Sequence, residues 1–271
     1  MPELPEIANL ARQMTKQLRG KRVSDLDVTQ PRCLNMSPKK FRRILGKTIE
    51  ETNARGKWLF TNLSPNDNLL LNLGMGGDLR YHRKGTTLPQ KYQFRWSHDD
   101  GTELTVSFSW FGYIHLASEK ELFKHKMTRN LGISPLDKEF TVQKLASLLS
   151  GRRGAIKSFL LNQKNVAGIG NVCVQDILFK ARLHPLRMTQ TLAESEIEAL
   201  CRSICEVLNQ GIRLGGLKYE RDLYGRHGKY GPEYFLVAYK THEPCPLCKT
   251  AIVKIKTGST ASYICPKCQR L

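Results

Sequence analysis

Two pairs of cysteines near the C-terminus constrain this chain more than any other feature. Cys245 and Cys248 form one Cys-x-x-Cys pair, Cys265 and Cys268 form another, and sixteen residues separate the pairs. Two such turns can present four thiolates tetrahedrally to one zinc ion. We therefore expect one structural zinc ion, and no redox or nucleotide cofactor.

The residues between the two pairs favour a β-hairpin that folds around the metal. Alternation over 251–255 and the run 262–264 predict its two strands. Four protein ligands leave no open coordination position, so folding of this tail should depend on the metal. Disulfides are the alternative, but the N-terminus lacks the pattern of a secretory signal, and cytoplasmic thiols are kept reduced.

The remaining cysteines show no metal spacing. They are Cys33, Cys173, Cys201 and Cys205. We expect them to be buried, reduced thiols.

The chain carries a large excess of positive charge. Lys and Arg number 43 against 24 Asp and Glu, which gives a formal net charge of +19. Basic residues recur from 39–43 to 249–270, which predicts a surface that binds a polyanion. A generic basic surface is the alternative. A membrane partner is disfavoured, because the chain has no long apolar segment or basic amphipathic anchor.

The length and patterning predict an α+β protein of at least two domains. Apolar spacing predicts a helix over 3–18, with Pro5 in its first turn. Short β-rich runs over 20–117, with one helix near 37–45, predict an antiparallel sandwich or barrel.

After Leu136 the pattern becomes helical. Helices are predicted over 142–149, 155–163, 171–182 and 194–212. Thr191 and Glu194 suggest a capping box for the last helix. The glycine-rich stretch 215–232 has no apolar period and is expected to form a mobile loop.

The first six residues suggest covalent chemistry. Removal of Met1 would give Pro2 a free secondary amine, which can attack a sugar carbon and form an iminium. Glu3 is adjacent, and Glu6 lies one helical turn beyond, so one carboxylate could supply a proton and the other orient the amine. Alternatively, both acids simply favour the positive end of the helix dipole.

Motifs from end to end resemble the formamidopyrimidine-DNA glycosylase and endonuclease VIII family, of which the chain would be a divergent member. They are Pro2–Glu6, Gly56–Lys57, Leu73–Met75, Gly168–Asn171 and the four cysteines. The resemblance implies three parts. They are an N-terminal helix with a β-sandwich (1–130), a helical domain with a helix-two-turns-helix unit (131–236) and a zinc hairpin (237–271).

The resemblance also implies a bifunctional glycosylase and abasic-site lyase of base excision repair. Pro2 would displace a damaged base, and β,δ-elimination would cut the strand. Glu3 would protonate the sugar ring oxygen, Glu6 would help to hold the nucleophile and Lys57 would contact phosphate. An ordinary solvated lysine is the alternative for Lys57.

Further residues match positions that contact DNA in this family. Lys157 resembles a phosphate-facing position, and Asn171 would donate to phosphate, cap a helix, or do both. Met75 and Phe111 match residues that fill the gap left by an everted base, although large apolar residues are more often core. The lesion-loop candidates are Tyr219, Tyr224 and Arg226.

The chain departs from the family pattern in parts that face DNA. Trp110 stands where an arginine usually faces the unpaired base, which favours stacking without hydrogen-bond readout. Asn72 replaces a common histidine, Ser134 replaces a common glutamate, and 257–264 lacks the usual arginine. We therefore do not expect efficient excision of 8-oxoguanine paired with cytosine. Formamidopyrimidines, oxidised pyrimidines and lesions in single strands stay open as substrates.

Two other functions compete with this hypothesis. A damage- or structure-specific DNA-binding protein could keep the fold with weak or no turnover. A zinc-ribbon regulator or ribosomal component would not need Pro2, Glu3 and Glu6. The expected partner is damaged duplex or single-stranded DNA, bound by a monomer at the nucleoid in the cytoplasm.

Overall fold

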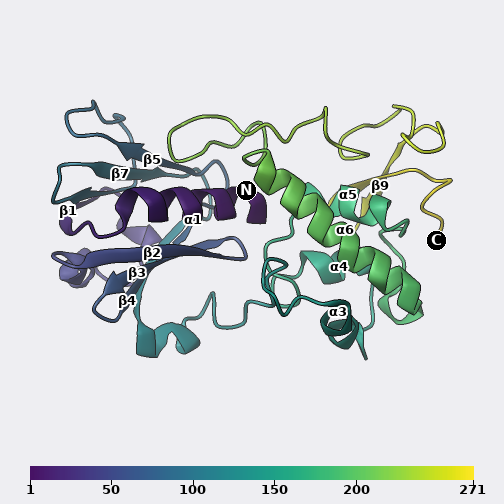
Figure 1. The fold of residues 1–271 in the computed structure, drawn as a ribbon, viewed down its shortest axis with the longest axis horizontal. Helices are drawn as coiled ribbons and strands as arrows, with labels where there is room; N and C mark the ends of the chain where they lie inside the picture. The colour runs from purple at the N-terminus through teal and green to yellow at the C-terminus, as the bar shows by residue number, and fades with distance from the viewer. The chain divides into compact units, whose positions relative to one another are not determined.

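The fold is described from a computed structural model that covers residues 1–271. The chain divides into two units. The first contains Met1–Asn130 and Gly215–Lys229, and the second contains Leu131–Leu214 and Tyr230–Leu271 (Figure 1). The loop 215–229, placed with the helical domain in the sequence analysis, thus packs in the first unit.

The first unit is built from one long helix and two antiparallel sheets. Helix α1 (Leu4–Leu18) lies against strands β2 (Thr48–Arg55) and β3 (Trp58–Ser64). One sheet has the order β1-β6-β7-β5, with β1 Val23–Val28, β5 Asp78–His82, β6 Phe94–His98 and β7 Glu103–Ser107. The other has the order β2-β3-β4-β8, with β2 Thr48–Arg55, β3 Trp58–Ser64, β4 Asp67–Asn72 and β8 Tyr113–Ser118. The predicted sandwich is confirmed.

Short helices connect these strands. They are η1 (Pro31–Cys33), α2 (Pro38–Phe41), η2 (Arg42–Ile44) and η3 (Glu119–Lys124). Ser37 caps α2, because its hydroxyl accepts a hydrogen bond from the backbone N–H of Lys40 at 3.4 Å.

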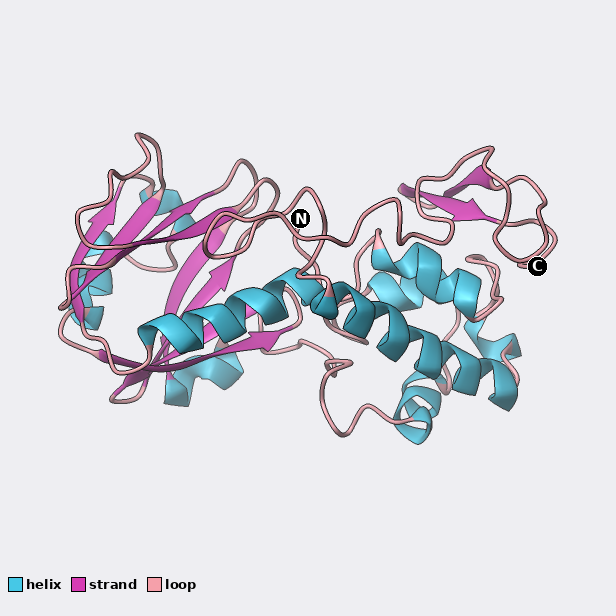
Figure 2. Cartoon of the chain, turned by 45° about the horizontal axis from the view of Figure 1, so that its top comes forward, coloured by secondary structure: helices cyan, strands magenta, loops and turns pink.

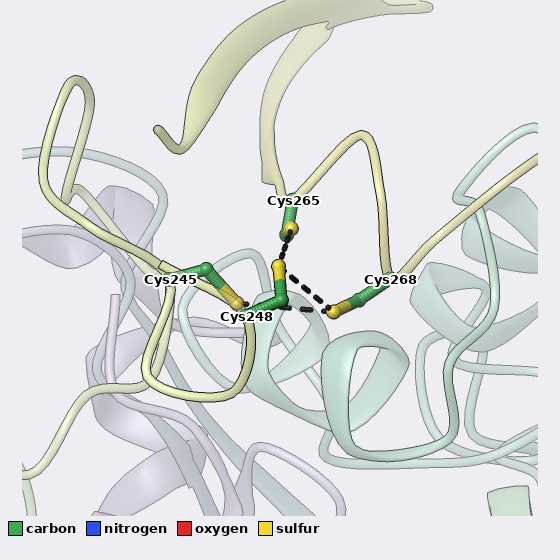
Figure 3. Close-up of side chains that lie close together, drawn as sticks. All are labelled: Cys245, Cys248, Cys265 and Cys268. Carbon is green, nitrogen blue, oxygen red and sulfur yellow. Dashed lines mark hydrogen bonds between the residues drawn. The ribbon is translucent and has the colours of Figure 1, made fainter. Parts of the chain in front are cut away.

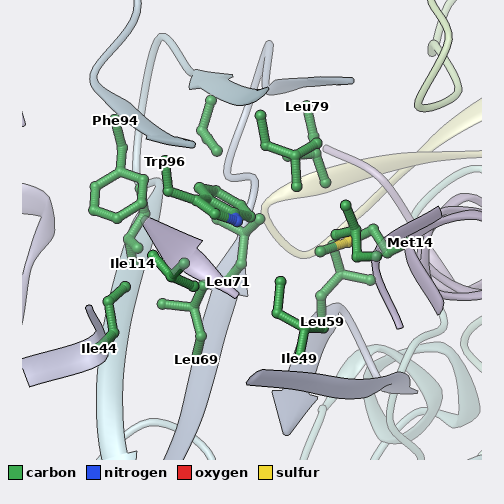
Figure 4. Close-up of a cluster of buried hydrophobic side chains, with 14 of the residues drawn as sticks. Met14, Ile44, Ile49, Leu59, Leu69, Leu71, Leu79, Phe94, Trp96 and Ile114 are labelled. Atoms are coloured by element: carbon green, nitrogen blue, oxygen red, sulfur yellow. The ribbon is translucent and has the colours of Figure 1, made fainter. Parts of the chain in front are cut away.

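Apolar side chains from α1 and both sheets fill one core (Figure 4). Trp96 from one sheet and Leu59 and Leu71 from the other are almost completely buried, as is Met14 of α1. Because this apolar surface is removed from water on folding, the core fixes the helix that carries the N-terminal residues.

The second unit is helical and ends in a hairpin (Figure 2). Its helices are α3 (Val142–Leu149), α4 (Ile156–Leu161), α5 (Cys173–Lys180), η4 (Thr189–Thr191) and α6 (Glu194–Arg213). Strands β9 (Val253–Thr257) and β10 (Thr260–Ile264) form the hairpin. The four longer helices and the hairpin were all predicted.

The predicted capping box of α6 is wrong. Thr191 lies in η4, and its hydroxyl donates to the carbonyl of Met188 at 2.9 Å. Ala193 is the residue before the helix, and its N–H donates to the Glu196 carboxylate at 2.8 Å. The helix therefore starts two residues later than a Thr191 cap requires.

A buried aspartate anchors the chain that leads into the hairpin. Asp176 of α5 accepts hydrogen bonds from the backbone N–H groups of Leu236, Val237 and Ala238 at 2.9–3.1 Å. Burial raises the pKa of this carboxyl, and the three backbone donors oppose that shift. One side chain thus orders three consecutive residues before the first cysteine pair.

Cys33, Cys173, Cys201 and Cys205 are free thiols, as expected. The first three are buried as predicted, whereas Cys205 is only half-buried, so the predicted burial is wrong for that residue. No helix in the structure combines the length and the apolar character that a membrane span needs.

Candidate functional site

The start of α1 gathers the predicted catalytic carboxylates in a buried position. Glu3 precedes the helix and Glu6 lies in its first turn, next to Pro5. The Glu6 carboxylate accepts one hydrogen bond from the backbone N–H of Glu3 at 2.7 Å and another from the N–H of Leu217 at 2.8 Å. Glu6 therefore joins the N-terminus of the helix to the loop 215–229, in the same unit.

The environment of Glu6 favours its neutral form. Burial raises the pKa of Glu6 to about 8, although the two backbone donors act in the opposite direction. Gly216 makes room for this side chain, since a Cβ there would lie 2.9 Å from the Glu6 carboxyl group, at a φ of +91°. A carboxyl group that holds two backbone segments and is largely protonated near pH 7 is suited to positioning those two segments.

The chain start lies beside a third carboxylate that the sequence analysis missed. Pro2 is buried, and the Met1 ammonium is 3.6 Å from Oε1 of Glu220. Burial raises the pKa of Glu220, and the charges of Glu3 and Asp78 raise it further. No local pattern marks Glu220 in the sequence, because its partner is more than two hundred residues away.

Polar contacts tie the loop to α1 and β5. The Gln13 amide donates to the Asp222 carboxylate at 3.0 Å and accepts from the N–H of Leu223 at 2.9 Å. The carbonyl of Leu223 in turn accepts from the N–H of Tyr81 at 2.9 Å. The segment predicted to be a mobile loop is thus anchored at several points along its length.

The three lesion-loop candidates differ in how they are held. The Tyr224 hydroxyl accepts from the Gln17 amide at 2.8 Å. Arg226 donates to Asp222 at 3.1 Å and lies over the Tyr224 ring. Tyr219 is exposed. Tyr224 and Arg226 therefore brace the loop, and Tyr219 presents most of its side chain to solvent.

Asn72 organises the turn that carries two other candidates. Its amide donates to the carbonyl of Lys57 at 2.9 Å and accepts from the N–H of Gly74 at 3.0 Å. Asn72 is buried, whereas the Lys57 side chain is only partly covered. The position of Asn72 therefore disfavours direct contact with DNA, because its amide already joins two backbone segments.

Three large apolar side chains project from two adjacent turns of the first unit. Met75, Trp110 and Phe111 are 43%, 65% and 66% exposed. The N–H of Met75 donates to the carbonyl of Trp110 at 2.8 Å, which holds the turns together. Gly74 permits this approach, since a Cβ there would lie 2.1 Å from the Trp110 carbonyl oxygen. None of the three is a core residue.

Lys157 does not face solvent. Its ammonium lies 2.6–3.0 Å from four oxygens of the hairpin, those of Thr257, Thr260, Ala261 and Ser262. Burial lowers the pKa of Lys157 to about 8. A phosphate contact, which the resemblance implies, would require this ammonium to leave the hairpin.

Asn171 lies at the turn before α5 but does not cap it. The helix begins at Cys173, with Val172 as the residue before it, so the predicted N-cap is wrong. The Gln175 amide donates to the Asn171 carbonyl at 2.9 Å and to the Ala261 carbonyl at 3.2 Å, and it accepts from the N–H of Tyr263 at 3.1 Å. Gln175, which the sequence analysis missed, therefore links this turn to the hairpin.

The four C-terminal cysteines converge, as predicted (Figure 3). Their sulfur atoms all lie within 4.8 Å of one another, and no pair is joined by a disulfide. Four convergent thiols are a donor set that suits zinc. They come from the two segments that flank strands β9 and β10.

Three family models match the chain in the order of its parts. The formamidopyrimidine-DNA glycosylase N-terminal domain matches residues 1–108, and its H2TH domain matches 131–221. A zinc finger found in FPG and IleRS matches 243–271.

The chain belongs to the formamidopyrimidine-DNA glycosylase family.

Relatives and solved structures of this family match along their whole length. The formamidopyrimidine-DNA glycosylase of Chloroflexus aurantiacus is 35% identical and that of Streptococcus pneumoniae serotype 4 is 32% identical, with at least 98% of each chain covered. The Lactococcus lactis Fpg in complex with DNA containing N7-benzyl-Fapy-dG has a TM-score of 0.91, at 29% identity and full coverage of both chains. Members of this glycosylase family act in base excision repair, and the chain is a DNA glycosylase of that pathway.

The buried Glu6 makes the stability of this glycosylase depend on pH. The pKa of Glu6 in the folded state, about 8, exceeds its usual value of 4.5. Its contribution is therefore complete below pH 4.5 and is lost as the pH rises through 8, with a slope of at most about 1.4 kcal/mol per pH unit. Glu6→Gln should remove this slope, which urea unfolding at pH 5.5, 7 and 8.5 measures.

Glu50→Gln is the matched control, because Glu50 is exposed on β2. It should keep the slope of the unmodified chain. Equal slopes in Glu6→Gln and in the unmodified chain would contradict the assignment of the neutral form to Glu6.

Proposed function

We propose that this glycosylase excises oxidised or ring-opened bases and cuts the strand through an iminium formed at Pro2. The buried grouping of Pro2, Glu3 and Glu6 carries the proposal, because Glu6 ties the chain start to the loop through Leu217. Helix α1 is fixed by the core, so the terminal nitrogen has a defined position.

The proposed reaction begins after removal of Met1. The Pro2 nitrogen attacks C1′, and the bond between C1′ and the base breaks with its electron pair leaving on the base. Glu3 then delivers a proton to O4′ as the sugar ring opens and the iminium forms. Loss of a proton from C2′ and then from C4′ drives β- and δ-elimination, in which the 3′ and 5′ oxygens leave with their phosphates, and hydrolysis of the iminium releases Pro2.

Solved relatives support the substrate class. Lactococcus lactis Fpg structures hold DNA that contains Fapy-dG, an abasic site or an oxidised pyrimidine. For this chain we propose damaged duplex DNA, or a lesion in a single strand, bound by a monomer at the nucleoid in the cytoplasm. Lys57 would contact phosphate near the lesion, and Tyr219 would contact the everted base.

Borohydride trapping on abasic-site DNA tests the mechanism. The processed chain should give a covalent adduct, and Pro2→Gly should lose most of it because the secondary amine is gone. Glu3→Gln should bind damaged DNA but lose base excision, which gel analysis of a damaged-base panel measures. Mass spectrometry should find that the active form begins at Pro2.

The competing function is damage-specific binding without turnover. It predicts tight binding of lesion DNA with no adduct from the processed chain. The exposed Trp110 is compatible with this alternative, because stacking on a base needs no turnover, whereas the burial of Lys157 reduces polar contact with DNA and disfavours tight binding.

We further propose that the four cysteines bind one structural zinc ion. Cys245, Cys248, Cys265 and Cys268 would hold it with no open position, so the ion would fix the hairpin and take no part in the reaction. Lys157 of α4 and Gln175 of α5 would then hold these two helices in a fixed position relative to the hairpin.

Metal removal should unfold the hairpin selectively. Metal analysis should find one zinc per chain, and a strong chelator should abolish hydrogen-exchange protection over 243–271. DNA affinity should fall, while protection of α1 and the two sheets persists, because their core lies in the first unit. A metal-free chain with a protected hairpin would contradict the zinc assignment.

The exposed Trp110 supports a stacking contact with the base opposite the lesion. An indole offers a π-face to any base, and base stacking contributes roughly 1–3 kcal/mol. Trp110→Ala should therefore lower excision from duplexes by a similar factor whichever base is opposite. Steady-state rates on four duplexes measure this.

Phe123→Ala is the control, because Phe123 is equally exposed in the first unit, at 68%, but lies on η3. It should leave all four rates unchanged. A loss confined to one opposite base would instead indicate specific readout by Trp110.

A further inference from the structure

The nucleophile needs a group that takes its protons. A terminal amine is mostly protonated at neutral pH, and only its neutral form can attack carbon. Glu6 does not suit this task, because it already accepts two backbone hydrogen bonds and is largely neutral near pH 7. Glu3 is assigned to protonate O4′, so a separate acceptor is required.

We propose that Glu220 is this acceptor and holds the Pro2 nitrogen during attack. The inference rests on the proposed function and goes beyond it by adding a carboxylate from the loop. In the structure, Glu220 forms the ion pair with the terminal ammonium, at 3.6 Å, and its side chain is only 12% exposed. The Pro2 nitrogen follows that of Met1 within roughly 3.6 Å, so the flexible side chain can reach it after Met1 is removed.

The loop gives Glu220 a fixed backbone. Its N–H donates to the carbonyl of Leu217 at 3.0 Å, and its carbonyl accepts from the N–H of Gly228 at 3.3 Å. Leu217 is in turn bound to Glu6. One network therefore positions both the helix start and the proposed acceptor.

The charges around Glu220 suit a base. Burial raises the pKa of Glu220 most, the terminal ammonium opposes this shift, and the nearby acids Glu3 of the chain start and Asp78 of β5 raise the pKa further. Asp78 is itself paired with Arg80 at 2.6 Å and with Arg221 at 3.9 Å. A carboxylate with a raised pKa accepts a proton more readily than an exposed one.

The protons balance along the proposed reaction. The Pro2 ammonium carries two protons, and Glu220 accepts the first of them as the nitrogen becomes nucleophilic. That proton passes to the departing base, which leaves with the electron pair of the glycosidic bond. The second proton leaves the nitrogen when Glu3 protonates O4′ and the iminium forms. This proton returns Glu3 to its protonated state.

Single-turnover trapping on abasic-site DNA across pH 5–10 tests the assignment, with enzyme in saturating excess. Glu220→Gln should lower the high-pH plateau rate by about 100-fold, because the neutral amine then lacks the carboxylate that holds it for attack, and a small misplacement can cost about that factor. The midpoint of the acid limb should move to lower pH by about one unit, because the amine loses a neighbouring negative charge. A role confined to loop packing would lower the plateau without moving the midpoint.

Two controls make each outcome decisive. Glu50→Gln should match the unmodified chain in plateau and midpoint. If Glu220→Gln no longer binds DNA in fluorescence anisotropy, Glu220→Ala with added formate decides, since formate should restore trapping. An unchanged plateau, an unmoved midpoint or a failed rescue would overturn the role of Glu220. Absence of any adduct from the unmodified, processed chain would instead overturn the proposed function itself.

Discussion

The two hydrogen bonds accepted by Glu6 are the contacts on which the candidate site depends. They join the backbone of Glu3 to that of Leu217, and so connect the start of α1 to a loop that follows more than two hundred residues later. Because the carboxyl is buried, losing either contact would leave a polar group without a partner in an apolar setting. The carboxylates near Pro2 are therefore ordered by packing as well as by helix geometry.

In the second unit too, buried polar side chains connect segments that are far apart in the chain. Polar side chains of Lys157, Gln175 and Asp176 are buried, and each bonds to segments far along the chain. Between them they fix the hairpin tip, one hairpin strand and the residues before the first cysteine pair. The two cysteine pairs close the other end of the hairpin. The small hairpin is held by these polar contacts and by the buried apolar cluster that includes Phe179, Ile252 and Tyr263.

The residues that the sequence analysis assigned to DNA contact separate into two kinds. Met75, Trp110 and Phe111 are exposed on adjacent turns, where they can reach a partner. Lys157 and Asn72 are buried and engaged with other parts of the chain. Residue type alone did not distinguish these groups, because a lysine or an asparagine serves equally well as a surface contact or as an internal connector.

The sequence by itself determined the features that depend on local spacing. These are the cysteine quartet, the helix over the first residues with its two glutamates, the β-rich runs that indicate a sandwich and the four longer helices. Spacing suffices there because helices, strands and paired metal ligands repeat over a few residues. Only the tertiary structure decided that Glu220 meets the chain start, that Gln175 and Lys157 hold the hairpin and that Ala193 precedes α6. These contacts join residues far apart in the sequence, or depend on where a buried side chain finds its hydrogen-bond partner, and no local pattern encodes that choice.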